Sequence, residues 1–284
     1  MFDIIVDLSG VVDFEYYNSW KVECFSIKDQ ILLTFIKLRL NLLNKDLAFR
    51  FNTSESTVCN IILTFIIVLH EIVFNQLMKT VPSQSKNKLC LPNCFVSFQN
   101  CRITIDCTEV ACDIPHQLDH QRATFSSYKH KNTLKGLIGV APIGVITFVS
   151  KLYPGSTSDK KIVSHCGILS LLEPGDLILA DKGFLISDLI PNGASLNIPP
   201  FLTSSQFTPS EVERTKTIAR ARIHVERAIS RIKGFKILSH IPKSLYKKSS
   251  IVFQLCASLV NFQNPLIREV ESLFIVSAPE HNDI

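Results

Sequence analysis

The chain has 284 residues, of which 46% are hydrophobic and 19% are charged, and its formal net charge is +5. This composition excludes a disordered protein, and the length predicts two structural units. The nine cysteines are an odd number scattered along the chain, which favours reduced thiols in an intracellular protein over a disulfide framework.

The first residues give no sign of a targeting segment. Residues 1–27 form a lead segment with early acidic residues and no basic region, which is not typical of a signal peptide. The most apolar stretch, residues 61–74, is interrupted by His70 and Glu71 and is predicted to be too short to cross a bilayer. We therefore expect no membrane as a partner.

Residues 28–78 are predicted to form a small all-α domain. Apolar residues recur at helical spacing from 31 to 42, a second short pattern spans 44–51, and a third helix opens at residue 55 after a polar turn. Two helices joined by such a turn are typical of a helix-turn-helix. Its candidate DNA-contacting residues are Ser54, Ser56, Thr57 and Asn60. A helical scaffold without DNA contact stays open, because the third helix is unusually apolar for a groove reader.

Residues 79–100 contain several Pro, Ser and Asn residues and are predicted to be a linker. Cys90 and Cys94, with Cys101 nearby, are side chains of the type that hold zinc. No second pair at regular spacing completes a ligand set, so structural zinc is the less favoured interpretation.

Residues 101–265 are predicted to form a mixed α/β domain, followed by a tail at 266–284. Strands are expected at 103–107, 134–140, 145–152 and 177–180, and helices at 158–172, 208–233 and 249–262. In the long second helix, Thr208 and Glu211 predict a capping box and Pro209 the first helical position, while Gly234 predicts the end.

Four acidic residues of this domain stand out by position. Asp106 and Asp181 each close an apolar strand, Asp159 follows a run of small residues, and Glu226 lies at the edge of the apolar stripe of the long helix. Singly, such an Asp is more often a turn former or helix cap, and Glu226 could simply pair with Arg222. Together they predict a site where two divalent ions act on a phosphodiester. Mg²⁺ is the expected ion, with Mn²⁺ as the alternative.

Neighbouring residues receive weaker predictions. Glu109 is the third residue along the strand from Asp106 and is expected on the opposite face, which disfavours it as a ligand. Eight Lys or Arg against three Glu between residues 211 and 236 suit a phosphate backbone, with a solvated helix face as the alternative. Candidates to hold DNA phosphate near the metals are Lys129, Lys131, Lys182, Arg222 and Arg227.

Several strings also resemble the DDE nuclease domain of the PIF/Harbinger-type transposases. They are IDCTE (105–109), SSYKHKNTLKGLIGVAPIGVITFVSKLYPGSTSDK (126–160), EPGDLILADKGF (173–184), LNIPPF (196–201) and RIHVERAISRIKGF (222–235). Residues 31–61 resemble the helix-turn-helix that precedes this domain. The resemblance covers most of the chain from about residue 30 to 265.

The resemblance implies a ribonuclease H-like mixed sheet with flanking helices, which the predicted strands and helices also suggest. It assigns Asp106, Asp181 and Glu226 as catalytic, and these three with Asp159 as metal ligands. The implied activity is a metal-dependent DNA endonuclease and transposase that acts on transposon ends in the nucleus. A domesticated DNA-binding protein that does not cleave is the alternative.

The sequence shows no zinc-coordinating module of the kind that some relatives carry. A longer element, an accessory DNA-binding protein that recognises the ends, and a homo-oligomer therefore all stay open as expectations.

Overall fold

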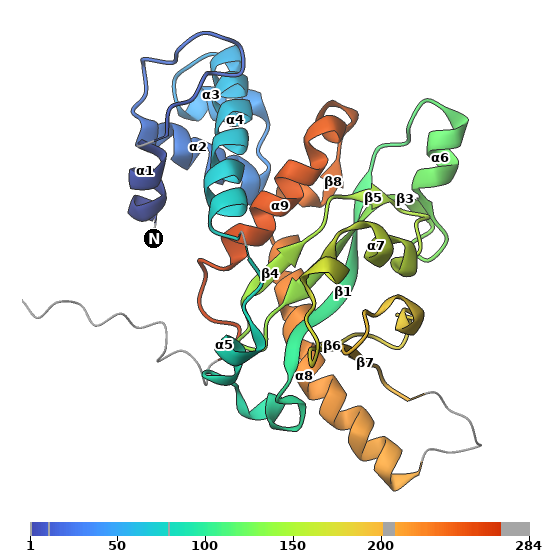
Figure 1. The fold of residues 1–284 in the computed structure, drawn as a ribbon. Coiled ribbons are helices and arrows are strands. Elements are labelled where there is room, and N and C mark those ends of the chain that lie inside the picture. The colour runs from blue at the N-terminus through green and yellow to red at the C-terminus, as the bar shows by residue number, and fades with distance from the viewer. Residues whose placement is uncertain (1, 11, 79, 201–207, 268–284) are drawn as a thin grey trace, which may run out of the picture.

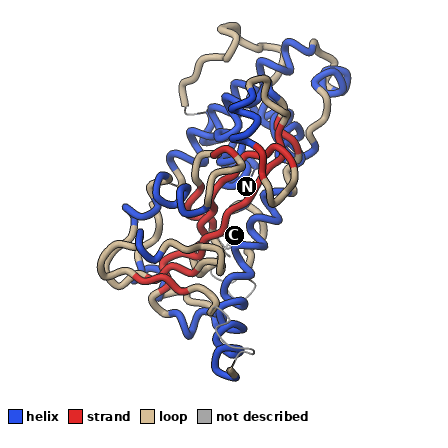
Figure 2. The backbone as a smooth tube through the Cα atoms, turned by 90° about the vertical axis from the view of Figure 1, so that its right-hand side faces the viewer, coloured by secondary structure: helices blue, strands red, loops and turns tan. Residues whose placement is uncertain are grey.

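The computed structural model describes residues 2–10, 12–78, 80–200 and 208–267 (Figure 1). The predicted tail at 266–284 lies outside the described residues from 268 onward. A helical part comes first, and a mixed α/β part follows, as the sequence predicts. Figure 2 shows the strands running through the middle of the molecule, with helices around them.

The helical part begins with five segments. They are α1 (Phe2–Gly10), α2 (Ile27–Leu40), α3 (Asn44–Arg50), α4 (Glu55–Leu69) and the π-helical η1 (His70–Gln76). Ser26 caps α2 by accepting a hydrogen bond from the Asp29 amide, and Ser54 does the same for α4 through the Thr57 amide. The three helices of the predicted helix-turn-helix are present, and the third begins at the predicted residue.

The helix formed by α4 and η1 is longer than the apolar stretch at residues 61–74. It runs without a break over Glu55–Gln76 and is, among the described residues, long and apolar enough by composition to cross a membrane. The prediction that this stretch is too short was therefore wrong. However, 61% of its most apolar window is buried inside the protein, against α2, α3 and α9 (Ser249–Val260). That is the behaviour of a core helix.

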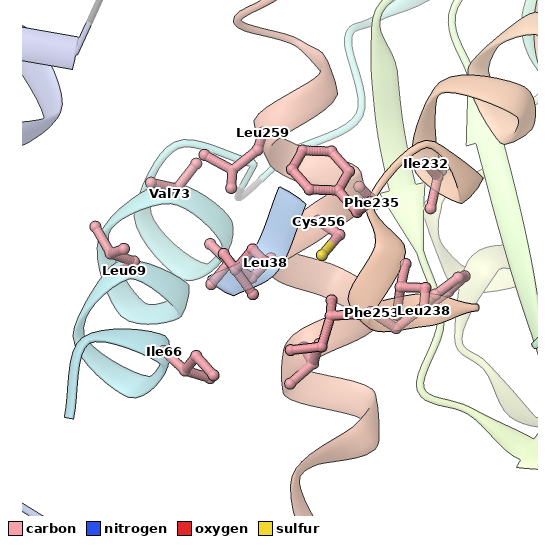
Figure 3. Close-up of a cluster of buried hydrophobic side chains, with 14 of the residues drawn as sticks. Leu38, Ile66, Leu69, Val73, Ile232, Phe235, Leu238, Phe253, Cys256 and Leu259 are labelled. Atoms are coloured by element: carbon pink, nitrogen blue, oxygen red, sulfur yellow. The ribbon is translucent and has the colours of Figure 1, made fainter. Parts of the chain in front are cut away.

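The helical part and the α/β part share one hydrophobic core. Leu38, Leu69 and Val73 belong to the same buried cluster as Phe235, Cys256 and Leu259 (Figure 3). Side chains from α4 and η1 face those of α9 across this cluster, and His70 Nε2 lies 2.9 Å from Gln254 Oε1. The orientation of the predicted DNA-reading helices is therefore fixed by packing.

The segment expected to be a linker is folded and packed. It contains α5 (Gln84–Lys88) and the 3₁₀ helix η2 (Asn93–Phe98), and both Phe95 and Phe98 are buried in a cluster with Ile218. The buried Asn87 side chain donates hydrogen bonds to the carbonyls of Cys101 and Arg102. These contacts fix the start of the first strand.

Within the described residues, the sheet contains eight strands: β1 (Cys101–Cys112), β2 (Phe125–Ser126), β3 (Lys131–Val140), β4 (Ile146–Val149), β5 (Tyr153–Pro154), β6 (Leu177–Leu179), β7 (Ser195–Asn197) and β8 (His240–Ile241). β3 pairs antiparallel with β1 and β4, while β6 runs parallel to β1 and β7 parallel to β6. The strand predicted to end near Asp106 continues to Cys112, because β3 pairs with it as far as Ala111.

Helices and short 3₁₀ turns complete the α/β part. They are α6 (Leu118–Thr124), α7 (Asp159–His165), η3 (Ile168–Leu171), η4 (Ser187–Leu189), α8 (Pro209–Lys233), η5 (Lys236–Leu238), η6 (Lys243–Lys248) and α9. The expected helix over 158–172 is divided, because Gly167 adopts a left-handed conformation with φ 84° and ends it. The predicted capping box, first-position proline and end of α8 are confirmed.

The long helix α8 lies across the sheet only in its second half. Its buried residues begin at Ile218 and continue to Ile232, in contact with β1 and β3. No residue from Pro209 to Thr217 is buried, and Figure 1 shows this first part projecting beyond the sheet. The second half of α8 therefore delivers Arg222 and Glu226 to the sheet.

Candidate active site

The pairing of two parallel strands brings Asp106 and Asp181 together. The pairing between β1 and β6 ends where Thr104 of β1 faces Leu179 of β6. Each aspartate lies two residues further along its strand direction. Since neighbouring strands lie about 4.8 Å apart, this register puts the two aspartates side by side at the end of β6.

Arg222 connects the second aspartate to the glutamate of α8. Its Nη1 lies 2.9 Å from Asp181 Oδ1, and its Nη2 lies 3.6 Å from Glu226 Oε1, one helical turn away. The Arg222 side chain is only 11% exposed, whereas both carboxylates are about half exposed. The prediction that Arg222 holds DNA phosphate is therefore corrected: it points from the buried side of α8 into the site and pairs with its own carboxylates.

Asp106 is a partly buried carboxylate of β1. Its Oδ1 accepts a hydrogen bond of 2.8 Å from the Cys107 amide. Burial raises the pKa of the Asp106 carboxyl to about 6, and the charges of Asp181 and Glu226 add to the rise, against the opposite effects of Arg222 and the Cys107 amide. Burial is thus the main reason that the charged form of Asp106 is disfavoured, and Arg222 only partly offsets it.

Asp159 approaches from the start of α7, which Ser158 caps. Lys135 Nζ lies 3.4 Å from Asp159 Oδ1 and 3.6 Å from Glu109 Oε1. The backbone of Gly155 makes this approach to the sheet possible: a Cβ there would lie 2.1 Å from Thr133 Oγ1 and 2.6 Å from the Thr124 carbonyl oxygen. A lysine on β3 therefore ties Asp159 to β1.

All four predicted carboxylates line one cleft of about 570 Å³. The cleft is lined by Asp106, Cys107, Thr108, Glu109, Tyr128, Lys129, Lys135, Asp159, Asp181, Gly183, Phe184, Glu226, Ile229 and Lys233. Glu109 is therefore part of the site, contrary to its predicted place on the far face. One edge of β1 pairs with β3, and the other edge pairs with β6 at residues 101–104 and with β8 at residues 111–112. Between the β6 and β8 pairings, residues from both faces of β1 border the cleft.

The donor chemistry of the cleft fits a hard divalent cation. Its acidic side chains offer carboxylate oxygens, the ligands that Mg²⁺ prefers, and a bound cation would stabilise the charged form of Asp106, which burial disfavours. In the part of the chain that the structure describes, no three His, Cys, Asp or Glu side chains are grouped closely enough to hold one ion. Arg222 instead pairs with Asp181 and Glu226, and Lys135 pairs with Asp159 and Glu109.

The cysteines considered as zinc ligands have separate surroundings in the structure. Cys101 is fully buried at the start of β1, and Cys94 Sγ lies 3.3 Å from His224 Nε2. All nine cysteines lie in the described ranges and are free thiols.

The predicted DNA-contacting residues divide into two groups. The exposed group consists of Lys129, Lys131, Lys182, Arg227, Ser54 and Ser56. Thr57 is partly exposed. Asn60 is fully buried: its side chain accepts from the Asn18 amide and donates to the Trp20 carbonyl. The prediction that Asn60 reaches DNA is therefore wrong, because the lead segment packs over it.

Several lining residues were not predicted as site residues, among them Lys233, Lys135 and Tyr128. Lys233 lies seven residues after Glu226, which is two helical turns on the same face, so helical spacing could have found it. Burial lowers the pKa of Lys233, while the charges of Asp106 and Glu109 raise it. Lys135 had no comparable sequence signal, because its partners Glu109 and Asp159 are distant in sequence. Tyr128 had none either.

A helix-turn-helix region precedes a mixed sheet whose cleft is lined by carboxylates. The family model described as DDE superfamily endonuclease matches residues 105–261, and the model described as helix-turn-helix of DDE superfamily endonuclease matches residues 24–73. The first match covers more than half of the chain. The protein therefore belongs to the DDE superfamily endonuclease family and is a DDE transposase-type protein. A comparison with curated proteins found no match to the chain.

Proposed function

We propose that this protein is a metal-dependent DNA endonuclease and transposase that acts on transposon ends. The observation that carries the proposal is the meeting of Asp106, Asp159, Asp181 and Glu226 in one cleft of a DDE-family chain. Asp106, Asp181 and Glu226 are the proposed catalytic residues, and Asp159 is a further metal ligand at the edge of the cleft.

The strand order supports a ribonuclease H-like assignment for the α/β part. Neighbouring strands run β4, β3, β1, β6 and β7, with the first three antiparallel and the last two parallel to β1. This arrangement puts β1 beside β6 in the middle of the sheet, where both aspartates emerge, and α8 across the same end.

Mg²⁺, or Mn²⁺ in its place, would be held by these carboxylates and would supply an activated oxygen nucleophile and stabilise the leaving oxygen. The chain itself supplies position and charge. Arg222 holds the carboxylates of Asp181 and Glu226 near each other, and Lys135 holds Asp159 against Glu109. The exposed Lys129, Lys131, Lys182 and Arg227 would bind the phosphates on either side of the scissile bond.

A cleavage assay on candidate element ends tests this proposal. The wild-type protein should cut with Mg²⁺ and not with EDTA. Asp181→Asn and Glu226→Gln should each reduce cutting to background while DNA affinity in EDTA stays unchanged, since each substitution removes a charge at nearly constant volume. Cutting at the wild-type rate by both variants would place the active site elsewhere.

A DNA-binding protein that does not cleave is the second candidate, and one observation favours it. Arg222 already pairs with Asp181 and Glu226, so a metal ion must compete with an internal cation. If this candidate holds, Mg²⁺ will neither bind the protein nor support cutting, although the DNA is still bound.

The remaining assignments extend the same proposal. The exposed start of α4 with Ser54 and Ser56 would contact DNA as part of the helix-turn-helix. The nucleus is the proposed location, since the substrate is chromosomal DNA. A second copy of the chain or an accessory DNA-binding protein would help to recognise the two ends.

A further inference from the structure

An exposed aromatic residue stands at the rim of the carboxylate cleft. Tyr128 lines the cleft together with Asp106 and Glu226, yet 78% of it is exposed. It contributes almost nothing to the hydrophobic core. A large aromatic ring kept in water beside a predicted catalytic centre is therefore available to a ligand.

The turn that carries Tyr128 is held in place on both sides. Ser126 pairs with Lys131 across the hairpin, and the Lys129 amide donates to Ser126 Oγ. His130 adopts a left-handed conformation with φ 52°. Below the turn, the Asn132 side chain donates to Thr124 Oγ1 and to the Gln121 carbonyl. The ring thus projects from a hydrogen-bonded hairpin.

The charges around the ring select the kind of ligand. Lys129 Nζ lies over one face of the Tyr128 ring, 4.5 Å from its centre, and the charges of Lys129 and Lys131 also act on Lys233, another residue of the cleft. An aromatic face with cations beside it suits a nucleobase whose phosphates follow the cations. The bases inside a duplex already have both faces covered, so the free face of the ring favours an unpaired base.

We propose that Tyr128 is a stacking surface for one unpaired nucleobase next to the scissile phosphate, with Lys129 on the adjoining phosphate. This inference rests on the proposed function as a DNA endonuclease, because it places the base beside the same carboxylates. It makes the cleft selective for DNA that is frayed or single-stranded at the cleavage position. Tyr128 is in this sense a positioning residue of the substrate strand.

The test uses the full chain in EDTA, so that no cutting occurs, and oligonucleotides with 2-aminopurine at the position next to the expected cleavage site. One probe carries this base in an unpaired extension, and the other carries it inside a duplex of equal length. The wild type should quench the unpaired probe. Tyr128→Ala should abolish the quenching and weaken binding of that probe roughly 5- to 100-fold, the loss expected for one stacked base, with little effect on the duplex.

Two control variants sharpen the result. Tyr128→Phe keeps the ring and should bind like the wild type. Tyr17 forms a similar pair with Lys248, 4.3 Å from its ring, on another part of the molecule, so Tyr17→Ala should leave the preference for the unpaired probe unchanged.

Equal losses on both probes, unchanged binding by Tyr128→Ala, or a Tyr128→Phe variant as weak as Tyr128→Ala would each overturn the stacking role. Because the assay contains no metal, its outcome is separate from that of the cleavage assay, which alone decides the proposed catalytic function.

Discussion

The N-terminal helices and the cleft both hold polar groups away from water. In the helices these groups have internal hydrogen-bond partners, whereas in the cleft a carboxyl has a raised pKa. Among the helices, the buried Gln30 donates to the carbonyls of Val22 and Phe25 and accepts from the Tyr16 hydroxyl, and Asn60 is equally well bonded. In the cleft, Asp106 is partly buried near two other carboxylates, and its pKa is raised to about 6.

This difference distinguishes polar groups that stabilise the fold from polar groups that serve the proposed site. A buried amide with internal partners stabilises a unique packing, whereas a partly buried carboxyl with a raised pKa in a cleft is a candidate functional group. Asn60 was predicted to bind DNA only from its position after the turn. Its hydrogen bonds now assign it to the core, while the raised pKa of the Asp106 carboxyl in the cleft supports the proposed site.

Replacing Asn60 should have the largest effect on stability. Asn60→Ala leaves the Asn18 amide and the Trp20 carbonyl without their partner, which should reduce the free energy of unfolding by roughly 2–4 kcal/mol. Chemical denaturation measures the change. If Asn60→Ala keeps the stability of the wild type but binds DNA more weakly, Asn60 contacts DNA and the prediction is contradicted.

The metal-free protein should lose stability as pH rises through the range of the Asp106 carboxyl. The folded pKa of about 6 exceeds the ordinary value of 3.8, so the folded state holds the proton more tightly. The contribution is fully present below about pH 4 and is lost by pH 7, which amounts to at most about 3 kcal/mol. Denaturation in EDTA at several pH values should show this trend in the wild type and a flatter one in Asp106→Asn.

Gly155→Ala should damage the cleft through a steric clash. The new Cβ meets backbone carbonyl oxygens that cannot move aside, so we expect a loss of roughly 1–3 kcal/mol and weaker cleavage as Asp159 is displaced. Gly183 lies in the same cleft, and a Cβ there meets nothing within 4 Å. Gly183→Ala is therefore the matched control, and equal effects of the two variants would contradict this explanation.

The smallest change in stability is expected at the start of α4. Ser56 is exposed, so Ser56→Ala should alter the free energy of unfolding by less than about 0.5 kcal/mol. If this end of the helix contacts DNA, the affinity for element ends should still fall by a few-fold in a binding titration. Unchanged affinity would leave the helical part as a scaffold.

Local patterns allowed much of the fold to be predicted. The caps of α8 and the start of α4 depend on residues within one helical turn, so the sequence alone located them. Arg222 and Asn60 were misassigned because their partners lie about 40 residues away, at Asp181 and at Asn18 and Trp20. Glu109 was misplaced because the open edge of β1 depends on where β6 and β8 pair with it.

The most direct test of the central claim is the thermal unfolding of wild type and Asp106→Asn at pH 7, each with EDTA and with Mg²⁺. If the carboxylates are held together for a cation, the wild type should have the lower melting temperature in EDTA and the larger increase with Mg²⁺, and Asp106→Asn should be more stable in EDTA and gain little. A wild type that is already the more stable protein in EDTA and does not respond to Mg²⁺ would contradict the account.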